Sequence, residues 1–365
     1  MTENLEGPRT NPELREQQAE DVYAHSPFAQ MRAAQAERGQ DFTAAFTDVD
    51  NTFHRKDRQT ASDALAEQAE REQIPLVAVT GNDLAGIEKR QATNELPKFP
   101  VLIGSVGTEI HVLQPDGTYH RDEEFREMLL KEKHFDRPTI ARAAAELIAD
   151  LAEHIPEAEL NYQGTELSPY RQAEEAYVKD PEANKESVQE FKVSFHFFAD
   201  SPEGVETIAR EAEQRFPGQE LVICEEINYN NQLSPEAQRK KYCLDVVPIT
   251  KAGAVEYVVK RTEVKKGLVA GDSGNDTDML MKSGKLQAVI VGGAKSELTS
   301  AVDATAVEKP GKSSFRRVVG EDGTLKAMYV ERGDRKGPES INYAGEVLQR
   351  ADNIKKIREE RDKAA

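Results

Sequence analysis

Short apolar runs alternate with amphipathic segments over much of the chain. The runs have the length and composition of buried strands, and the segments between them place apolar residues on one side of a helix. Apolar strands separated by helices predict a parallel sheet with helices on both faces, a Rossmann-like, doubly wound α/β fold. The expected strands are Ala44–Phe46, Ile74–Val79, Val101–Ile103, Ile110–Leu113, Gly267–Ala270 and Ala288–Val291, and the expected helices are Ser62–Gln73, Leu84–Arg90 and Lys251–Arg261.

Residues 112–243 have a different pattern and are expected to form a separate α/β domain. This domain would be inserted between two parts of the core, residues 41–111 and 244–330. Ala288–Val291 is the last clear strand expected in the core. The elements expected in the insertion are a helix Thr139–Ile155, a loop over 160–187, a strand Phe191–Phe198, a helix from Ser201 to Arg215, and strands Leu221–Cys224 and Tyr242–Val247.

The expected strand Phe191–Phe198 alternates between apolar and polar residues. Its apolar side chains point one way, and Lys192, Ser194 and His196 point the other. A strand of this kind is half-buried, so that its polar face can meet a ligand or solvent.

The two ends of the chain are more polar than the rest. Residues 1–40 are expected to form a polar extension, in which Leu14–Ala36 could be helical, and residues 331–365 a linker followed by a charged helix. Neither end carries residues that suggest chemistry. Their composition is compatible with contact to a protein partner.

Composition narrows the classes of function. The net charge is −18, which disfavours binding to nucleic acid and to anionic membranes. No apolar run reaches the length of a membrane span, and the first residues lack the pattern of a secretory signal, so a cytoplasmic protein is expected. The two cysteines, Cys224 and Cys243, are expected to be reduced thiols that could lie on one sheet.

Polar residues with chemical potential follow several of the expected strands. Asp48 and Asp50 follow the first strand, Thr80 ends the second, Lys251 begins a helix, and Asp272 follows a later strand, with Asp276 one turn further on. Each alone could be a solvated turn or a helix cap. Together, at one edge of a parallel sheet, they offer a carboxylate nucleophile, a second acid, a hydroxyl, a cation and ligands for a hard divalent cation. That set suits phosphoryl transfer.

These motifs resemble those of a known enzyme superfamily. The segments DVDNT (48–52), TGN (80–82), Lys251 and GDSGND (271–276) resemble the four motifs of haloacid dehalogenase superfamily phosphatases. The insertion between the second and third motifs resembles the C2-type cap of subfamily IIB. Within that subfamily the chain looks similar to sucrose-phosphate phosphatases, because it also carries GTEI (107–110), KVSF (192–195) and LDVVP (244–248).

The resemblance implies roles for individual residues. Asp48 would be the nucleophile, and Asp50 the general acid and then the base. Mg²⁺ would be held by the carboxylates of Asp48 and Asp272 and the backbone carbonyl of Asp50, with Asp276 supporting the metal site. The residues expected to contact the phosphoryl group or the sugar are Thr80, Gly81, Asn82, Thr108, Glu109, Lys192, His196, Lys251 and Asn275.

Two departures from the pattern stand out. Lys251 follows Pro248 by three residues, a shorter loop than in the family, and Gly293 stands where the family often has asparagine. The shorter loop leaves the placement of Lys251 open. The glycine weakens the inference of the family's substrate more than the inference of its chemistry.

Several functions fit the sequence. Sucrose 6-phosphate is the leading substrate, and mannosylglycerate phosphate and mannosylfructose phosphate are alternatives. A phosphomutase would need several arginines in the cap, whereas Arg171 is the only one in its irregular middle. A non-enzymatic sugar-phosphate-binding protein would be expected to have lost Asp48 or Asp50, and both are present.

Overall fold

The computed structural model describes most of the two predicted domains. The described residues are 22–154, 189–199, 201–225, 240–282 and 286–295, together with 179, 298, 316–319, 325–329 and 337–345 except 343. The expected loop over 160–187, Arg171 and the first part of the expected helix Leu14–Ala36 therefore lie outside the described residues, apart from residue 179.

A nine-stranded sheet forms the core, in the order β11-β12-β10-β9-β1-β2-β3-β4-β5. The strands from β12 to β3 in this order run parallel, while β11 at one end of the sheet and β4 and β5 at the other pair antiparallel with their neighbours. The order reverses at β1 and β9, which makes this pair the switch point where ligands bind in open α/β sheets. The strands are β1 (Thr43–Thr47), β2 (Leu76–Val79), β3 (Val101–Gly104), β4 (Glu109–Leu113), β5 (Tyr119–Arg121), β9 (Lys266–Gly271), β10 (Gln287–Ile290), β11 (Arg316–Val319) and β12 (Leu325–Tyr329).

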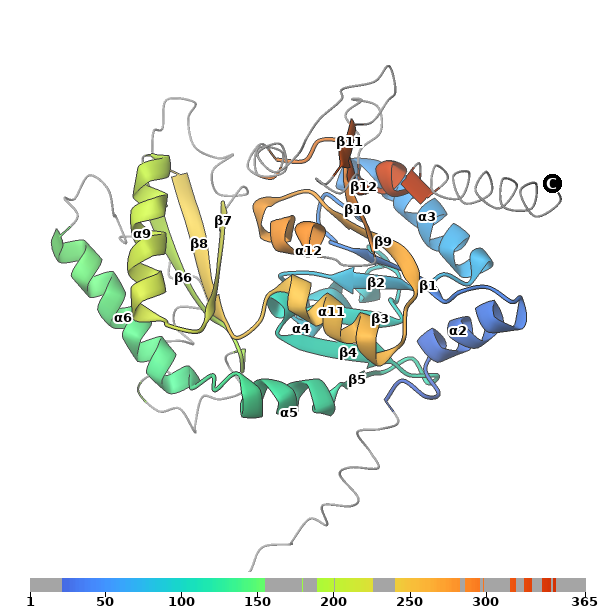
Figure 1. Ribbon diagram of the computed structural model, residues 1–365, viewed down its shortest axis with the longest axis horizontal. Helices are drawn as coiled ribbons and strands as arrows, with labels where there is room; N and C mark the ends of the chain where they lie inside the picture. The colour runs from blue at the N-terminus through green and yellow to red at the C-terminus, as the bar shows by residue number, and fades with distance from the viewer. Residues whose placement is uncertain are drawn as a thin grey trace, which may run out of the picture.

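Helices cover both faces of this sheet (Figure 1). Along β1, Ala44 and Phe46 belong to one apolar cluster and Ala45 to the other, because successive side chains of a strand point to opposite faces. Helices α3 (Gln59–Glu72) and α4 (Leu84–Ala92) pack on one face, and α5 (Glu123–Glu132), α11 (Lys251–Arg261) and α12 (Thr277–Met281) on the other. The predicted doubly wound core is confirmed.

The inserted residues form a smaller antiparallel sheet in the order β6-β8-β7. Its strands are β6 (Val193–Ala199), β7 (Glu220–Glu225) and β8 (Lys240–Val247), and helices α6 (Arg137–His154) and α9 (Pro202–Arg215) pack on one of its faces. Figure 1 shows these helices on the side of the small sheet away from the core. Cys224 and Cys243 are free thiols that lie opposite each other in β7 and β8.

The division between the two sheets differs from the expected boundaries at 112 and 244. Strands β4 and β5 belong to the large sheet, and β8 belongs to the small sheet along its whole length. The inserted unit therefore lies between α5, which packs on the core sheet, and Pro248, rather than between 112 and 243. Apolar alternation looks the same in an antiparallel edge strand of the core and in a strand of the insertion, which is why the sequence did not separate them.

Three further segments extend the core. Helix α2 (Pro27–Glu37) packs on the sheet through buried Phe28, although residues 1–40 were expected to form a polar extension. Strands β11 and β12 continue the sheet beyond β10, which was expected to be the last clear core strand. Residues 338–342 are helical, and buried Ile341 joins the cluster under α3, so part of the expected tail belongs to the core.

The expected start of α3 at Ser62 is also corrected. The helix begins at Gln59, and Ser62 lies within it, where its hydroxyl donates to the carbonyl of Phe53 at 2.9 Å. Ser62 was expected to be the N-cap of this helix, but its hydrogen bond instead connects the helix to the turn after β1.

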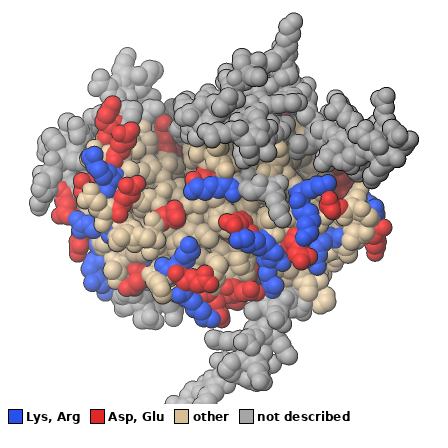
Figure 2. Space-filling model, viewed as in Figure 1, with Lys and Arg blue, Asp and Glu red and all other residues tan. Residues whose placement is uncertain are grey.

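Acidic and basic side chains are interspersed over the face drawn in Figure 2. The coloured residues of this view do not form a continuous basic stripe of the kind that follows a nucleic-acid backbone. None of the helices in the described part of the chain combines the length and the apolar character that a membrane-crossing helix needs.

Candidate active site

The structure brings Lys251 and three aspartates together at the carboxyl ends of β1 and β9. Lys251 is the first residue of α11 and is 1% exposed. Its Nζ lies 2.7 Å from Oδ1 of Asp48 and 2.7 Å from Oδ1 of Asp276. The shorter loop after Pro248 therefore still delivers the ammonium group to the nucleophile predicted from the sequence.

Burial shapes the charges of this cluster. Burial raises the pKa of Asp48 well above its usual range, and the carboxylate of Asp276 adds to the rise while Lys251 opposes it. Burial and then Asp276 raise the pKa of Asp272 to about 7. Burial lowers the pKa of Lys251, but the carboxylates of Asp276 and Asp48 outweigh it, and the net direction is upward. Lys251 therefore stays protonated. Its single positive charge does not balance the three neighbouring acids, Asp48, Asp272 and Asp276.

Asp276 organises the loop after β9. Its Oδ2 accepts from the backbone N–H groups of Asp272 at 3.1 Å and Ser273 at 3.2 Å, while Oδ1 accepts from Lys251. Both oxygens of Asp276 therefore have protein partners. Asp272 accepts from the hydroxyl of Thr52 at 3.2 Å, which ties the loop after β9 to the turn after β1.

The acidic residues fit a hard divalent cation. Carboxylate oxygens of Asp48, Asp272 and Asp276 all lie within 4.8 Å of one another and are buried. Mg²⁺ prefers oxygen ligands, and a buried group of carboxylates needs positive charge. Because the oxygens of Asp276 already accept hydrogen bonds from the protein, Asp48 and Asp272 are better suited to direct ligation.

Thr80, Asn82 and Asp50 form a second group of polar contacts, between the end of β2 and the turn after β1. Thr80 is buried at the end of β2, and its Oγ1 accepts from the backbone N–H of Asn82 at 3.1 Å and from the side-chain amide of Asn82 at 3.2 Å. The same amide donates to Oδ2 of Asp50 at 3.1 Å. Asn51 has a φ of 61°, a left-handed conformation that asparagine tolerates, within the turn that presents Asp50. The predicted second acid thus shares one amide with the predicted phosphate-binding hydroxyl.

A strained loop connects this site to the small domain. Ser105, Val106 and Gly107 have φ values of 50°, 64° and 102°, and a positive φ is rare for valine. The N–H of Ser105 donates to the carbonyl of Asn82 at 2.9 Å, and that of Val106 donates to the carbonyl of Thr80 at 3.0 Å. The buried side chain of Val106 contacts two further apolar residues of the small sheet, Val222 and Val247.

The same loop borders a cleft between the two domains. The cleft has a volume of about 690 Å³ and is lined from the core by α4 and β4 and from the small domain by the start of α6. Thr108 and Glu109, two predicted substrate contacts, line it. Glu109 accepts from the hydroxyl of Ser105 at 2.6 Å and lies 3.1 Å from His111 Nε2. Burial raises the pKa of Glu109, but the contacts with His111 and Ser105 outweigh it and hold the pKa below its usual value.

The predicted polar face of β6 is confirmed. Val193, Phe195 and Phe197 are buried against the helices, whereas Lys192, Ser194 and His196 are half-buried on the other face. That other face is the one whose Val222 and Val247 meet Val106 of the core.

Asp245 of β8 lies on this polar face as well. Its Oδ1 accepts from Ser194 Oγ at 2.5 Å and lies 3.9 Å from Lys192 Nζ. Strand β7 lies against Gly274–Asp276, so half-buried Asn275 is placed where the small domain approaches the core.

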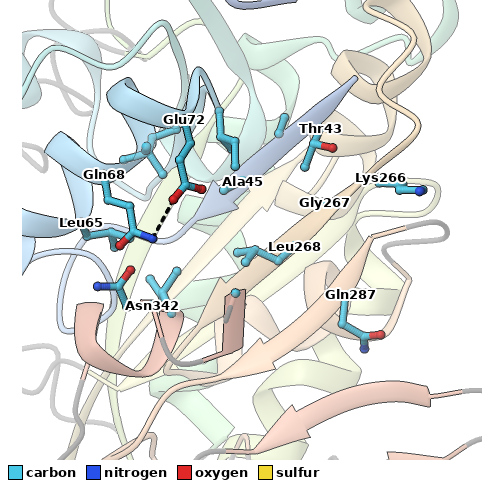
Figure 3. A pocket seen from close by; sticks show the side chains of 16 residues that line it. Thr43, Ala45, Leu65, Gln68, Glu72, Lys266, Gly267, Leu268, Gln287 and Asn342 are labelled. Carbon is cyan, nitrogen blue, oxygen red and sulfur yellow. Dashed lines mark hydrogen bonds between the residues drawn. The ribbon is translucent and has the colours of Figure 1, made fainter. Parts of the chain in front are cut away.

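A second cavity, of about 440 Å³, lies at the opposite edge of the large sheet (Figure 3). It is lined by the first residues of β1 and β9, by α3, and by Ile341, Asn342 and Gly345. Its only charged lining residues among those described are Glu72, which accepts from Gln68 at 3.1 Å, and Lys266. It lies at the amino ends of the strands and brings no pair of carboxylates together, so it is not suited to the chemistry proposed for the other edge.

Sequence reasoning missed three residues that contact Asp50 or its turn. Arg90 lies near the end of α4 and donates to Asp50 at 2.9 Å, Glu95 accepts from Arg90, and His54 lies 3.1 Å from Glu95. Helical periodicity indicates which face of α4 is buried but not which distant acid a half-buried arginine contacts. No signal in the sequence points to this contact.

Comparisons with known proteins agree with this geometry. A family model described as sucrose-6F-phosphate phosphohydrolase matches residues 43–164 and 173–314. The sucrose-phosphatase from Synechocystis sp. PCC6803, solved in complex with sucrose and phosphate, is similar with a TM-score of 0.54 and 18% identity, covering 84% of this chain and 97% of that one.

A haloacid dehalogenase-like hydrolase from Bacteroides thetaiotaomicron has a TM-score of 0.43 and 15% identity, covering 71% of this chain and 92% of that one. The search of curated proteins gave no match. At such low identity, the likeness to the Synechocystis structure supports the fold.

Proposed function

Because the chain belongs to the sucrose-6F-phosphate phosphohydrolase family, we propose that its site hydrolyses a sugar phosphate through an aspartyl-phosphate on Asp48. Membership of the family makes the protein a phosphatase that acts on sugar phosphates. The observation that carries the assignment of residues is the contact of Lys251 with Asp48 and Asp276 at the switch point of the sheet. A buried cation beside a strand-end carboxylate suits a nucleophile that approaches an anionic phosphate.

The first half-reaction transfers the phosphoryl group to the protein. Lys251 fixes one oxygen of Asp48, and an oxygen of Asp48 attacks phosphorus as the bond from phosphorus to the sugar oxygen breaks. Asp50 gives its proton to the departing sugar oxygen, which would otherwise leave as a high-energy alkoxide. Lys251 and the hydroxyl of Thr80 bind the non-bridging oxygens of the phosphoryl group.

The second half-reaction returns Asp48 to its starting state. Asp50, now a carboxylate, takes a proton from water, and the water oxygen attacks phosphorus to release inorganic phosphate. The proton lost to the sugar is thereby recovered, so the cycle balances. Asp48 and Asp272, with the backbone carbonyl of Asp50, would hold Mg²⁺, and Asp276 would support the site. When bound, Mg²⁺ supplies positive charge that neutralises the phosphate.

We propose sucrose 6-phosphate as the substrate. The family model is described by that reaction, and the Synechocystis structure contains sucrose and phosphate. The cleft between the domains, of about 690 Å³, has the volume of a small-molecule site, and its polar lining includes Thr108 and Glu109 but neither Asp48 nor Lys251. Gly81, Asn82, Asn275 and the polar face with Lys192 and His196 complete the proposed contacts. Mannosylglycerate phosphate and mannosylfructose phosphate remain the competing substrates.

Phosphate release from a panel of sugar phosphates tests the proposal. We expect the highest kcat/KM for sucrose 6-phosphate with Mg²⁺, loss of activity with a chelator, and a loss of about 1,000-fold or more in Asp48→Asn. A preference for another glycosyl phosphate would show that sucrose 6-phosphate is not the main substrate, while the aspartyl-phosphate mechanism would still stand. Equal phosphate release by the wild type and Asp48→Asn would refute the catalytic role of Asp48.

A further inference from the structure

The carboxylate of Asp50 is held at both of its oxygens. Nη1 of Arg90 donates to Oδ1 at 2.9 Å, and the side-chain amide of Asn82 donates to Oδ2 at 3.1 Å. The Asp50 side chain is 54% exposed, whereas that of Arg90 is 18% exposed. An exposed carboxylate is normally free to turn about its side-chain bonds, so two donors from different directions restrict its orientation.

Arg90 is in turn fixed by Glu95. Oε1 of Glu95 accepts from Nε of Arg90 at 3.0 Å and lies 2.9 Å from Nη2, so the acid engages two nitrogens of the guanidinium and leaves Nη1 for Asp50. The planar guanidinium can serve two carboxylates at once in a fixed geometry, which a lysine cannot.

Glu95 also lies close to His54, a residue of the turn that carries Asp50. Nε2 of His54 lies 3.1 Å from Oε1 of Glu95, and His54 is 4% exposed. Its backbone N–H donates to Val49, and its carbonyl accepts from Asn51, both at 2.8 Å. Arg90 and Glu95 therefore connect helix α4 to the turn after β1, through the hydrogen bond of Arg90 to Asp50 and through the close approach of Glu95 to His54.

We propose that Arg90, held by Glu95, is a positioning residue that orients Asp50 for proton transfer to the leaving sugar oxygen. This inference rests on the proposed function of the same site. A general acid must lie within hydrogen-bond reach of the atom it protonates, and a freely turning carboxylate spends little time there. The competing possibility is a surface ion pair, which contributes about 0–1 kcal/mol to stability and nothing to catalysis.

Two substrates with different leaving groups separate these possibilities. A sugar oxygen needs a proton in order to leave, whereas p-nitrophenolate leaves without one. The value of kcat/KM reports the steps up to the first irreversible one, which is phosphorylation of Asp48, so the later use of Asp50 as a base does not enter. A role in orienting the acid should therefore affect the sugar phosphate selectively.

The experiment compares Arg90→Gln, Arg90→Lys and wild type on p-nitrophenyl phosphate and on the sugar phosphate with the highest wild-type activity. For Arg90→Gln we expect kcat/KM to fall about 10- to 100-fold on the sugar phosphate and less than about 3-fold on p-nitrophenyl phosphate. Arg90→Lys should lie between Arg90→Gln and wild type, because one ammonium group can reach Asp50 but cannot also hold two contacts to Glu95.

Two further variants sharpen the result. Asp50→Asn should show the same selectivity to a larger degree, and adding Arg90→Gln to it should cause no further loss on the sugar phosphate. Arg261→Gln is the matched control, because Arg261 forms an ion pair with Glu124 at 3.1 Å and is 31% exposed, but lies at the far end of α11. This control should leave both activities unchanged.

The outcomes are distinct. Equal losses on both substrates, additive losses with Asp50→Asn, or no loss on either substrate would each overturn the positioning role while the phosphatase activity stands. If the wild type and Asp48→Asn release phosphate equally, the proposed function fails and the role of Arg90 fails with it.

Discussion

At the scale of single residues, the charge of the site is set by a buried group of three carboxyl groups, Asp48, Asp272 and Asp276, with the ammonium group of Lys251 beside two of them. Lys251 contacts Asp48 and Asp276, but the pKa of Asp48 is still raised well above its usual range and that of Asp272 is raised to about 7. Burial is the first cause of both shifts, and the neighbouring carboxylate of Asp276 is the second. A bound cation would remove much of this cost.

Stability should therefore depend jointly on pH and Mg²⁺. A carboxyl whose folded pKa is about 7 and whose unfolded pKa is about 4 stabilises the metal-free protein at low pH, and this contribution is lost as pH rises through that window. Mg²⁺ binds the ionised carboxylates, so it competes with protons. We expect Mg²⁺ to raise the melting temperature by several degrees at pH 8 and by much less at pH 5.5.

Asp272→Asn is the control for this prediction. It removes one charge from the cluster, so the metal-free variant should lose less stability between pH 5.5 and pH 8 than the wild type does. The stabilisation by Mg²⁺ at pH 8 should also shrink. An equal effect of Mg²⁺ at both pH values in the wild type would contradict the prediction, and differential scanning fluorimetry measures it directly.

At the scale of elements, the turn from β3 into β4 contacts both the segment with Thr80 and Asn82, two proposed phosphate-binding residues, and the small domain. Its three consecutive positive φ values place the Val106 side chain among Val222 and Val247, while its backbone N–H groups bind the carbonyls of Thr80 and Asn82. For Ser105 and Val106 such backbone strain costs about 1–3 kcal/mol each and persists only where the surroundings determine it, whereas glycine adopts a positive φ without this cost. The surroundings here are the helix start at Lys251 and the end of β2.

Gly107 is the tightest point of this turn. A Cβ added there would lie 2.6 Å from the carbonyl oxygen of Thr250 and 2.7 Å from the backbone nitrogen of Lys251, and the φ of 102° also disfavours other residues. Gly107→Ala should therefore push the start of α11 away and displace the Lys251 ammonium. We expect kcat/KM to fall by about 100-fold, the scale of loss that a displacement of about 1 Å causes.

Gly39→Ala provides the matched control for Gly107→Ala. Gly39 also has a positive φ, of 66°, but nothing lies within 4 Å of an added Cβ. It should cost about 1 kcal/mol of stability and leave kcat/KM unchanged. Similar kinetics for the two variants would show that backbone strain alone, without the contact to Lys251, explains the effect at Gly107.

At the scale of the whole molecule, the core is assembled from segments that are far apart in the sequence. Residues 338–342 pack beside α3 and the sheet, where Ile341 is 2% exposed. The hydroxyl of Ser340 accepts from the backbone N–H of Gly292 at 3.0 Å, just after β10. This part of the chain therefore contributes to the stability of the core domain, and Gly337, just before it, packs against the backbone of Asn51 and Thr52 in the turn after β1.

Ile341→Ala tests this contribution. Truncating a buried isoleucine should lower the free energy of unfolding by about 2–5 kcal/mol, whereas Asn342→Ala, at the next and half-buried position, should change it by about 0.5 kcal/mol or less. Both variants should keep the wild-type kcat/KM well below the melting temperature. Chemical denaturation measures the difference, and equal stability of the two variants would place Ile341 outside the core.

The sequence by itself determined the class of fold, the helices that frame the site and the residues at the strand ends. Short apolar runs and helical periodicity are local signals of burial, and α6, α9 and α11 appear within two residues of their expected bounds. Asp48, Asp272 and Asp276 could be grouped from the sequence because the carboxyl ends of parallel strands lie at one edge of a sheet, whereas Lys251 joined them through the resemblance to the family motifs.

Only the tertiary structure decided which residues hold Asp50 and where the two domains divide. Arg90 is 40 residues from Asp50 and meets it because α4 returns along the sheet. Strand β4 belongs to the core because it pairs with β3, and β11 and β12 belong to it because β12 pairs with β10. Ile341 is buried because it packs against α3. Local hydropathy encodes that a side chain is buried, whereas its partner depends on how distant segments pack.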